Sequence, residues 1–597
     1  MLISTYAKAF TGEKEIDGIW YNIVTKVATA EVISAKGSKY SGNIIIPSTI
    51  EYEGVVCSVT AIKESAFSYC DNLTSVELPS SITSIGSMAF LYCPKLSSIK
   101  IPSSVSEIGY RAFAGCSGLS SISVESGNST YDSRNNCNAI IETATNKLIQ
   151  GSNNTVIPND VLSIGTFAFE ACSGLSSINI PSKVTTIEAC AFFWCTNLNN
   201  ITIPENVTSI ERGAFQGSGI ISIKIPNSIT EILFDTFSGC SKLQTISFPD
   251  NIKKIGSAFY GCTSLKNIDI PNSVKTLDGG AFSGCTNLNS VSLGDGITEI
   301  GYSTFSDCSS LQTLNLGSNI TKIGEAAFRN CTSLTSLSFL NNVSNLGLHA
   351  FEGCSGLIDI SIPENINSLG KEVFYNCVNL QTVKTGDNLK TISQGTFRGC
   401  INLSSISLGQ NTEVIEGDAF QSCRNLTEIS FPSSLKSIGN GAFHSCGLTA
   451  IYIPDNVGTI SGGAFASCSK LSKVILGKGL SSIGEYAFQE CTEIVDVFCF
   501  AESVPKTKSN AFFLAEIEYA TLHVPESSID LYKATSPWKN FKNIVAIKDE
   551  DTAIESVMSD KSENEYFMLN GQQSSYNNRG IMIVKSKNGR TKKIIVK

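Results

Sequence analysis

A phenylalanine recurs at near-constant spacing through most of the chain, and this repeat constrains the fold more than any other feature. Nineteen such phenylalanines occur from Phe67 to Phe512, and most steps between them are 23 residues, with a few of 22 or 24. The one long step, from Phe113 to Phe169, equals one period plus 33 extra residues. A period of this length predicts one small unit per repeat, with successive units stacked on one another. We therefore expect a solenoid, and not the handful of globular domains that the length of 597 residues would otherwise suggest.

Within a unit the sequence follows L-x-x-I-x-I-P-x-x-V-x-x-I-G-x-x-A-F-x-x-C, as residues 96–119 illustrate. The alternation in "LSSIKIP" predicts a short strand ended by Pro102, which has no N–H to donate. "SVSEIG" is expected to cross the second side of the coil, with Gly109 supplying a corner at positive φ. "YRAFAGC" is expected to form a single helical or 3₁₀ turn that points Phe113 and Cys116 inward.

Leucine and isoleucine at these offsets, with this period, indicate a leucine-rich-repeat solenoid that has one short parallel β-strand and one helical or 3₁₀ turn per coil. Each coil buries its apolar face only against its neighbours. At about 4.8 Å per strand, nineteen coils would make a curved rod on the order of 90 Å long.

The repeats are interrupted by an insertion near residues 126–155. Residues 139–142 and 147–150 are expected to form a hairpin around residues 143–146. Two interpretations stay open at this point, namely an elongated, broken repeat and a projecting recognition element.

Both ends of a solenoid need covers because the terminal coils expose apolar edges. Bulky residues suited to sealing the last coil are Tyr532, Trp538 and Phe541. The turn dipeptides Asn570-Gly571 and Asn588-Gly589 suggest strands in the tail. The expected segments are a β-rich N-terminal cap at 1–56, the solenoid at 57–519, a C-terminal cap at 520–547, an acidic linker at 548–564 and a small β element at 565–597.

Charge and hydropathy argue against two classes of partner. The net charge is −9, and no cluster of Lys and Arg stands out before the last dozen residues, so a nucleic acid is not expected as a partner. No apolar run approaches the roughly 18 residues of a membrane helix. The first twenty residues have no clear signal-peptide core, so the sequence does not decide whether the chain is exported.

Motifs that carry chemistry are missing from the sequence. The three histidines, His349, His444 and His523, fall at unrelated places in different units. No H-E-x-x-H, phosphate-binding loop, G-x-G-x-x-G or G-x-S-x-G occurs, and no carboxylate pair has a suggestive spacing. We expect no catalytic residue, no metal, no cofactor and no enzymatic activity.

Seventeen of the 21 cysteines follow a repeat phenylalanine by three residues. Zinc requires closely spaced cysteine pairs, and Cys190 with Cys195 comes nearest but has no second pair. Disulfides between coils are geometrically allowed at about 5 Å between Cα atoms, yet each thiol would have two equal neighbours. Ser218 and Ala515 occupy the same position in other units, so the position accepts small side chains without sulfur. What it requires is therefore packing volume and not thiol chemistry. Buried free thiols are the favoured interpretation, and disulfides remain the alternative.

The outward residue between the two inward strand positions forms a column along the solenoid, and hydroxyls and amides dominate it. Aromatic residues are nearly missing from this column before Tyr452, which favours a broad, multivalent surface over a compact hot spot. The region of Tyr452 and Ile475 is the best local candidate. The ligand-binding candidates are Lys100, Lys224, Asp269, Lys384, Tyr452 and Ile475.

"IPSSVSEIGYRAFAGCSGLSSI" and its copies closely resemble the BspA-like, or Treponema pallidum-type, leucine-rich repeats, over about residues 57–547. The tail, with "GIMIVKSKNGRTKKIIVK", is similar to C-terminal segments of exported Bacteroidetes proteins and is interpreted as a sorting or anchoring element. The resemblance implies a cell-surface or secreted adhesin that binds host matrix proteins, host cells or other bacteria. It supplies no binding residues, because adhesion in the family has no consensus motif.

Two functional hypotheses from different classes follow. The first is a non-catalytic adhesin that makes multivalent protein contacts through the solenoid surface. The second is a structural or spacer scaffold whose insertion or tail does the specific work. The oligomeric state and the identity of the ligand stay open.

Overall fold

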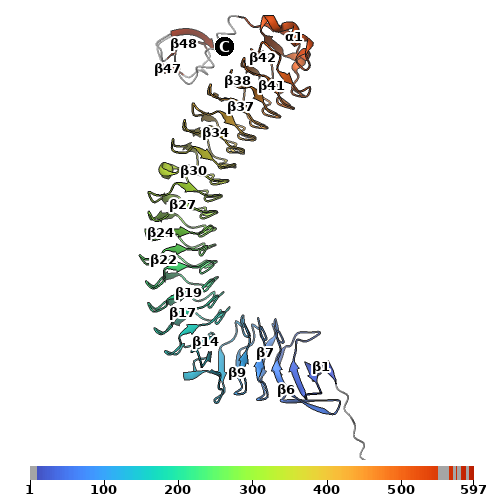
Figure 1. The fold of residues 1–597 in the computed structure, drawn as a ribbon, viewed down its shortest axis with the longest axis vertical. Helices are drawn as coiled ribbons and strands as arrows, with labels where there is room; N and C mark the ends of the chain where they lie inside the picture. Colours follow the sequence, from blue (N-terminus) through green and yellow to red (C-terminus); the bar gives the residue numbers. More distant parts are fainter. Residues whose placement is uncertain (1–9, 549–563, 569–572, 575–579, 587–590, 597) are drawn as a thin grey trace, which may run out of the picture. The chain divides into compact units, whose positions relative to one another are not determined.

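The computed structural model describes residues 10–548, together with strands at residues 564–568, 573–574, 580–586 and 591–596. The chain divides into two compact units, Met1–Asn319 and Ile320–Lys597. Each unit is built from short coils stacked in sequence order, as the strand labels of Figure 1 show. The predicted leucine-rich-repeat solenoid is therefore confirmed.

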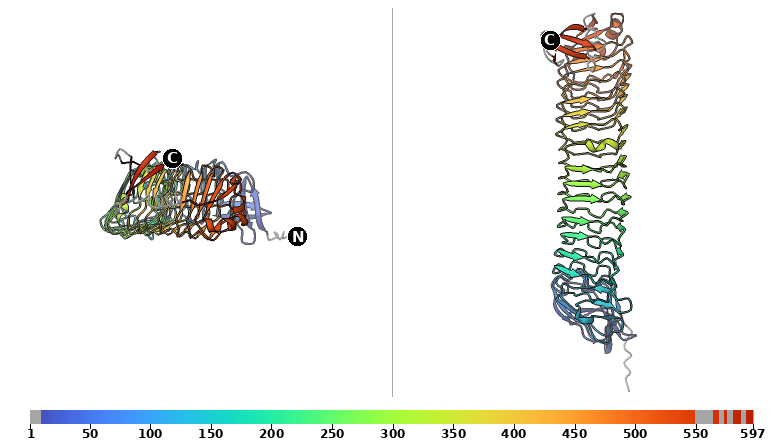
Figure 2. Two further views of the ribbon diagram at one scale, coloured as in Figure 1. Left: turned by 90° about the horizontal axis from the view of Figure 1, so that it is seen from above. Right: turned by 90° about the vertical axis from the view of Figure 1, so that its left-hand side faces the viewer.

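Most coils carry a strand of three to five residues on one side, and we call the surface that these strands form the strand face. Where strands of neighbouring coils pair, they pair in parallel and in register, so that Ser98 lies opposite Ser121 and Ile99 opposite Ile122. The right-hand view of Figure 2 shows such strands lying parallel from coil to coil. In the N-terminal unit they are β7 (Leu73–Glu77), β9 (Ser98–Ile101), β11 (Ser121–Val124), β16 (Ser177–Asn179), β18 (Asn200–Thr202), β20 (Ser222–Lys224), β22 (Thr245–Ser247), β24 (Asn267–Ile270), β26 (Ser290–Leu293) and β28 (Thr313–Asn315).

The C-terminal unit has the same pattern, with two coils that lack a regular strand. In one, the 3₁₀ helix η2 (Ser338–Asn342) stands in the strand position, and in the other Ser430 forms only an isolated bridge to Ser407. The strands of this face are β31 (Asp359–Ser361), β33 (Thr382–Lys384), β35 (Ser405–Ser407), β38 (Ala450–Ile453), β40 (Lys473–Leu476), β42 (Asp496–Cys499), β44 (Thr521–Val524) and β45 (Asn543–Ala546). A second side of each coil carries a two-residue strand, such as β10 (Glu107–Ile108), β15 (Ser163–Ile164), β17 (Thr186–Ile187) and β30 (Asn345–Leu346).

The repeat phenylalanines form an inward ladder of stacked rings. Phe67 and Phe90 have ring centroids 4.9 Å apart and an interplanar angle of 2°, and Phe259 and Phe282 lie 5.2 Å apart at 4°. These side chains are fully buried. Offset stacking adds about 0.5–1.5 kcal/mol per pair to the burial of the rings, so each stacked pair helps to link two neighbouring coils.

The segment that carries each repeat phenylalanine is a pair of tight turns, where the sequence suggested one helical or 3₁₀ turn. In the coil of Phe113, Arg111 has φ of 56° and Gly115 has φ of 75°. Left-handed residues before and after the phenylalanine recur in other coils, for example at Cys190 and Trp194. A residue in this region cannot continue a right-handed helix, so the backbone reverses twice within seven residues.

The expectation that Gly109 takes a positive φ is wrong, because it is not among the residues with positive φ. Glycine is needed there for a different reason. A Cβ on Gly109 would lie 2.3 Å from the backbone nitrogen of Ser87 in the preceding coil. Two coil backbones approach closely at this corner, and only a residue without a side chain allows it.

The cysteine three residues after each phenylalanine does more than fill volume. Its thiol donates to the carbonyl oxygen of the phenylalanine in the preceding coil, as Cys93 does to Phe67 at 3.0 Å and Cys285 to Phe259 at 3.2 Å. All 21 cysteines lie in the described part of the chain as free thiols. Burial raises the pKa of Cys285 to about 12, so the thiolate, which is the reactive form, is strongly disfavoured.

The insertion contains the predicted hairpin, formed by β13 (Ile140–Glu142) and β14 (Lys147–Gln150). β14 pairs in parallel with β15 of the next coil, and β12 (Tyr131–Asp132) pairs with β13. Ile140, Ile141 and Leu148 are fully buried. The insertion is thus built into the stack as an elongated repeat, and its hairpin shares the corner sheet of the following coils.

Both ends of the phenylalanine ladder are covered by aromatic residues. At the N-terminal end Tyr40 packs on Phe67, with ring centroids 4.7 Å apart. The sheet at this end includes β1 (Thr11–Ile16), β2 (Ile19–Val24), β3 (Thr29–Val32), β5 (Thr49–Tyr52) and β6 (Val55–Ile62). The strand β4 (Gly42–Ile45) pairs with β7. At the other end Phe512 packs edge-on against Trp538 and Phe541, at 5.7 and 5.6 Å. Trp538 lies beside the short helix α1 (Ile529–Ala534) and is fully buried.

Beyond β45, the described tail is one antiparallel sheet in the order β47-β46-β48-β49. Its strands are β46 (Asn564–Met568), β47 (Gln573–Ser574), β48 (Gly580–Ser586) and β49 (Thr591–Val596). Most of the expected acidic linker lies outside the described residues.

Candidate protein-binding surfaces

The strand face presents four of the six predicted ligand-binding residues to solvent. Lys100, Lys224, Asp269 and Lys384 are exposed and point outward between buried neighbours on β9, β20, β24 and β33. Parallel register places each of them beside an outward serine of an adjacent coil, such as Ser123 beside Lys100. The residues belong to different coils, so the fold does not gather them into one site.

Two of these lysines are already engaged in ion pairs. Lys100 Nζ lies 2.6 Å from a carboxylate oxygen of Glu125, and Lys224 Nζ lies 3.2 Å from one of Glu205. The hydrogen bond from Lys100 lowers the pKa of Glu125 below its ordinary value. Exposed pairs of this kind stabilise by at most about 1 kcal/mol, so either lysine can exchange its partner for a ligand carboxylate at small cost.

The expectation that Ile475 is exposed on the strand face is wrong, while its role as a ligand contact stays a prediction. Ile475 is only 2% exposed, although it points out of the same face as the polar column. It clusters with Phe498 and Phe500, and Tyr452 packs against this cluster as a partly buried neighbour. An alternation pattern gives the direction of a side chain but not what covers it, which is why the sequence misplaced this residue.

A second surface, which the sequence reasoning missed, lies on the turns that flank the insertion. We call it the aromatic turn cluster, and it consists of Tyr110, Phe167, Phe193 and Trp194. Ring centroids lie 5.7 Å apart for Tyr110 and Phe167, 6.3 Å for Phe167 and Phe193, and 6.2 Å for Phe193 and Trp194. Tyr110 is 57% exposed and Trp194 is 55% exposed.

Glycine makes room for the largest ring of the cluster. A Cβ on Gly217, which has φ of 68°, would lie 3.2 Å from the indole of Trp194. The cluster had a signal in the sequence, because the turn positions that hold its members are mostly small or polar in other units.

An ion pair joins the two coils on either side of the insertion, directly beneath the cluster. Arg111 Nε donates to Glu170 at 2.9 Å, and the hydroxyl of Tyr92 donates to the same carboxylate at 2.9 Å. The guanidinium of Arg111 also lies over the ring of Phe167, 4.2 Å from its centroid. The Glu170 side chain is completely buried, so the pair holds Tyr110 and Phe167 in a fixed relation.

A pocket of about 250 Å³ opens next to the cluster, between it and the insertion hairpin. Tyr110, Arg111 and Phe167 form one wall, and Tyr131, Glu142 and Lys147 lie on the hairpin side. Lys147 is paired with Glu188 at 2.7 Å. The pocket therefore offers aromatic surface with charged groups at its edge, which suits a side chain of a partner protein.

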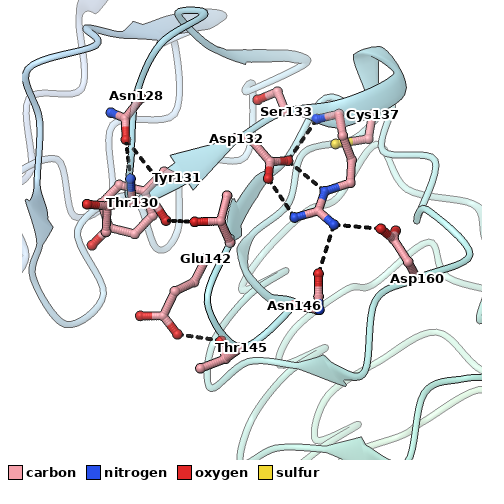
Figure 3. A network of polar contacts seen from close by, with 12 residues as sticks. Asn128, Thr130, Tyr131, Asp132, Ser133, Cys137, Glu142, Thr145, Asn146 and Asp160 are labelled. Carbon is pink, nitrogen blue, oxygen red and sulfur yellow. Dashed lines mark hydrogen bonds and ion pairs between the residues drawn. The ribbon is translucent and has the colours of Figure 1, made fainter.

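Polar contacts fix the insertion that forms the far wall of this pocket (Figure 3). Arg134 Nη1 donates to Asp160 at 2.6 Å and to Asn146 at 2.8 Å, and its Nε donates to Asp132 at 2.8 Å. The hydrogen bond from Arg134 lowers the pKa of Asp160. These contacts tie the hairpin turn to the segment that leads into the next coil.

The histidines and the other metal-ligand residue types are dispersed. Among the described residues, no group of three or more His, Cys, Asp or Glu side chains is arranged to hold a metal ion. His349 lies near Glu352, His523 near Asp496, and His444 near Ser445, so the three histidines do not meet. No helix in the described part of the chain is long and apolar enough to span a membrane.

Stacked parallel coils, an inward phenylalanine ladder and extended outer faces define a leucine-rich-repeat protein, a class that is generally non-enzymatic and binds proteins. The chain belongs to the BspA type leucine rich repeat family, whose model matches six times, at residues 43–161, 139–258, 256–381, 321–440, 347–470 and 413–535. The resemblance seen in the sequence is thereby confirmed. No curated protein is detectably similar to the chain.

Solved structures of bacterial leucine-rich-repeat proteins are similar to the chain. A protein from Bacteroides ovatus is 23% identical, covering 90% of this chain and 100% of that one, with a TM-score of 0.41. A leucine rich cell surface protein from Faecalibacterium prausnitzii is 24% identical, covering 66% and 94%, with a TM-score of 0.38. The T. pallidum leucine rich repeat protein is 20% identical, covering 46% and 90%, with a TM-score of 0.20.

Proposed function

We propose that the protein is a non-catalytic, adhesin-like protein of the cell surface or secreted fraction that binds other proteins through its solenoid. The observation that carries this proposal is the aromatic turn cluster. Trp, Tyr and Arg are the residues that dominate binding energy at protein interfaces, and here Tyr110 and Trp194 are more than half exposed beside Arg111. Membership in a family of surface proteins supports the location.

The strand face is proposed as a secondary, lower-affinity surface. Its charged residues Lys100, Lys224, Asp269 and Lys384 are spread over many coils. Weak contacts from such positions add through avidity when the partner is extended or repeated, as extracellular matrix proteins and cell surfaces are. The expected partners are host matrix proteins, host cell-surface molecules or other bacteria.

The test measures binding of the purified chain to fibronectin, fibrinogen and epithelial cells. Trp194→Asn with Tyr110→Ser removes both exposed anchors, and the asparagine suits the positive φ of 56° at position 194. Binding should fall at least tenfold, since hot-spot truncations typically exceed about 1–2 kcal/mol. Tyr302→Ser is the matched control, because Tyr302 also lies three residues before a repeat phenylalanine and is 61% exposed.

Each outcome separates the candidate functions. Equal loss in the control and the double variant would contradict a localised site. If binding is lost only when Lys224 and Lys384 are changed to Ser, the binding site lies on the strand face and not at the aromatic turn cluster. No binding by the intact chain would favour the alternative, a structural or spacer scaffold that displays its insertion or tail. Surface labelling of intact cells tests the location, and a wholly cytoplasmic result would refute it.

A further inference from the structure

A pocket of about 620 Å³ lies at the carboxyl ends of β24, β26 and β28 in the N-terminal unit, where Figure 1 labels β24. These strands form one sheet, in which Asp269, Ser292 and Asn315 lie side by side. The pocket therefore adjoins the polar column of the strand face at the predicted ligand-binding residue Asp269. We call it the strand-end pocket, and its polar lining includes Asp250, Asn272, Ser273, Ser292, Asp295 and Asn315.

Glycine replaces proline in two successive coils that line this pocket. Many coils have a proline directly after the strand, as at Pro271, whereas the next two coils have Gly294 and Gly317. A Cβ on Gly294 would lie 2.6 Å from the backbone nitrogen of Asn272, and one on Gly317 would lie 2.6 Å from the carbonyl oxygen of Gly294. The coil backbones approach closely here, so no side chain rises from this part of the pocket wall.

The hydroxyl of Ser273 is unpaired at this pocket. Its oxygen is buried and has no hydrogen-bond partner in the described part of the chain. Serines at the same position in other coils donate to a carbonyl oxygen of the preceding coil, as Ser104 does to Ile82 at 2.6 Å and Ser434 to Thr412 at 2.7 Å. A buried hydroxyl without a partner is costly, and a ligand that donates to Ser273 would remove that cost.

Two carboxylates of the pocket have oxygens that are free to accept. The backbone N–H and the hydroxyl of Ser318 both donate to Oδ1 of Asp295, at 2.7 and 2.9 Å. These bonds, the backbone one first, lower the pKa of Asp295 below its ordinary value, so the carboxylate stays charged at neutral pH. Oδ2 of Asp295 and both carboxylate oxygens of Asp250 have no partner among the residues that the structure describes.

Carboxylates at the same position of other coils have a cation of their own. Glu205 pairs with Lys224 at 3.2 Å, and Asp455 lies 4.0 Å from Lys478. In contrast, no Lys, Arg or His occurs among the described residues that line the strand-end pocket. A pocket with charged acceptors and no cation is complementary to a positively charged group supplied from outside.

We propose that the strand-end pocket binds an arginine side chain of a partner protein. A guanidinium carries five N–H donors and no acceptor, so it suits a wall of hydroxyl, amide and carboxylate oxygens that includes Ser273 and Asp295. Asp250 and Asp269 add negative charge on neighbouring coils. This inference rests on the proposed function, because the arginine belongs to a bound protein, and it gives Asp269 the role of attracting the cation.

The test is fluorescence anisotropy of a labelled tetra-arginine peptide mixed with the full-length chain, at about 150 mM salt, where charges more than about 8 Å apart are largely screened. Asp250→Asn with Asp295→Asn should weaken binding at least tenfold, because two charged acceptors become neutral. Glu205→Gln with Asp455→Asn is the matched control, since it removes two charges from the same position of other coils, and it should change binding less than twofold. Equal weakening by the two double variants, or no binding by the unmodified chain, overturns the proposal.

A second pair of variants tests the pocket without changing charge. Ser292→Phe fills the pocket and should also weaken binding at least tenfold, whereas Ser407→Phe adds the same ring at the outward position of another coil and should not. Binding that is unchanged by Ser292→Phe overturns the site.

Two competing probes test the chemistry of the ligand. A tetra-lysine peptide that binds as tightly as tetra-arginine, or a neutral hexasaccharide that displaces it, overturns the assignment to arginine. Binding of fibronectin or fibrinogen without binding of tetra-arginine would refute this inference alone. The reverse result would contradict the proposed function and support the pocket.

Discussion

One of the cysteines that follow the repeat phenylalanines can be replaced by alanine and by serine. The comparison tests whether the thiol acts as a hydrogen-bond donor or only fills space in the core. Cys285 is suited to this test, because it is fully buried and its Sγ lies 3.2 Å from the carbonyl oxygen of Phe259. That oxygen also accepts from the backbone nitrogen of Cys262 at 3.2 Å, so it keeps one bond when the thiol is removed.

The magnitude follows from these contacts. Cys285→Ala removes one sulfur from a packed site, which costs about 1 kcal/mol. It also removes a donor worth about 0.5–1 kcal/mol net. Cys285→Ser keeps a donor and loses less volume, so we expect about 0.5–1 kcal/mol in total. The alanine variant should therefore be less stable than the serine variant by about 1 kcal/mol.

The assay is hydrogen exchange of amides in the coils that contain Phe259 and Cys285, because defects in a repeat array are felt mainly by neighbouring coils. Cys190→Ala is the control: this cysteine is half-buried and outside the ladder, and its Sγ lies 3.9 Å from the nearest carbonyl acceptor. Its substitution should change local stability by no more than about 0.5 kcal/mol. Equal stability of the alanine and serine variants at Cys285, or a more stable alanine variant, would refute the donor role. It would mean that the thiol only fills space in the core.

Three further outcomes are expected. Iodoacetamide should modify Cys190 before any other cysteine in the native chain, since the other twenty are buried; uniform labelling of all 21 would contradict the packing, and peptide mass spectrometry distinguishes the two. Gly109→Ala should lower the free energy of unfolding by about 1–3 kcal/mol, because its Cβ would meet the backbone of Ser87. An unchanged midpoint of denaturant unfolding would exclude the close approach. Hydrogen exchange of the insertion's backbone amides should become faster below pH 3.8, the ordinary pKa of an aspartate, as the pH falls through the lowered pKa of Asp160. The reason is that only the charged carboxylate stabilises the fold, and its contribution is lost when it is protonated. Asp160→Asn should lose this pH dependence, and a variant that keeps it would assign the effect to another carboxyl group.

The coil was predictable from the sequence because its determinants are local. Phe113, Cys116 and the alternating strand residues recur with one period, and each faces the same neighbour in every coil. Gly109 shows the limit of that reasoning. Its position in the corner was correct, but the cause is the backbone of the preceding coil and not the local φ.

Surface assignments were less predictable, because exposure depends on what packs over a residue. Lys384 is exposed as expected, while Ile475, at the same position of another coil, is buried among residues from neighbouring strands. Trp194 and Tyr110 are 84 positions apart in the sequence, and they belong to one cluster only because the insertion is taken into the stack between their coils.

The sequence by itself determined the repeat, the inward ladder and the membership of the BspA type family, since periodic apolar residues can bury themselves only by stacking equivalent coils. Tertiary structure alone decided which outer surfaces are available. The buried carboxylate of Glu170 and its bond to Arg111 join coils across the insertion and bring the aromatic turn cluster together. Such contacts link residues far apart in the chain, and their energy depends on burial and geometry that no single repeat unit encodes.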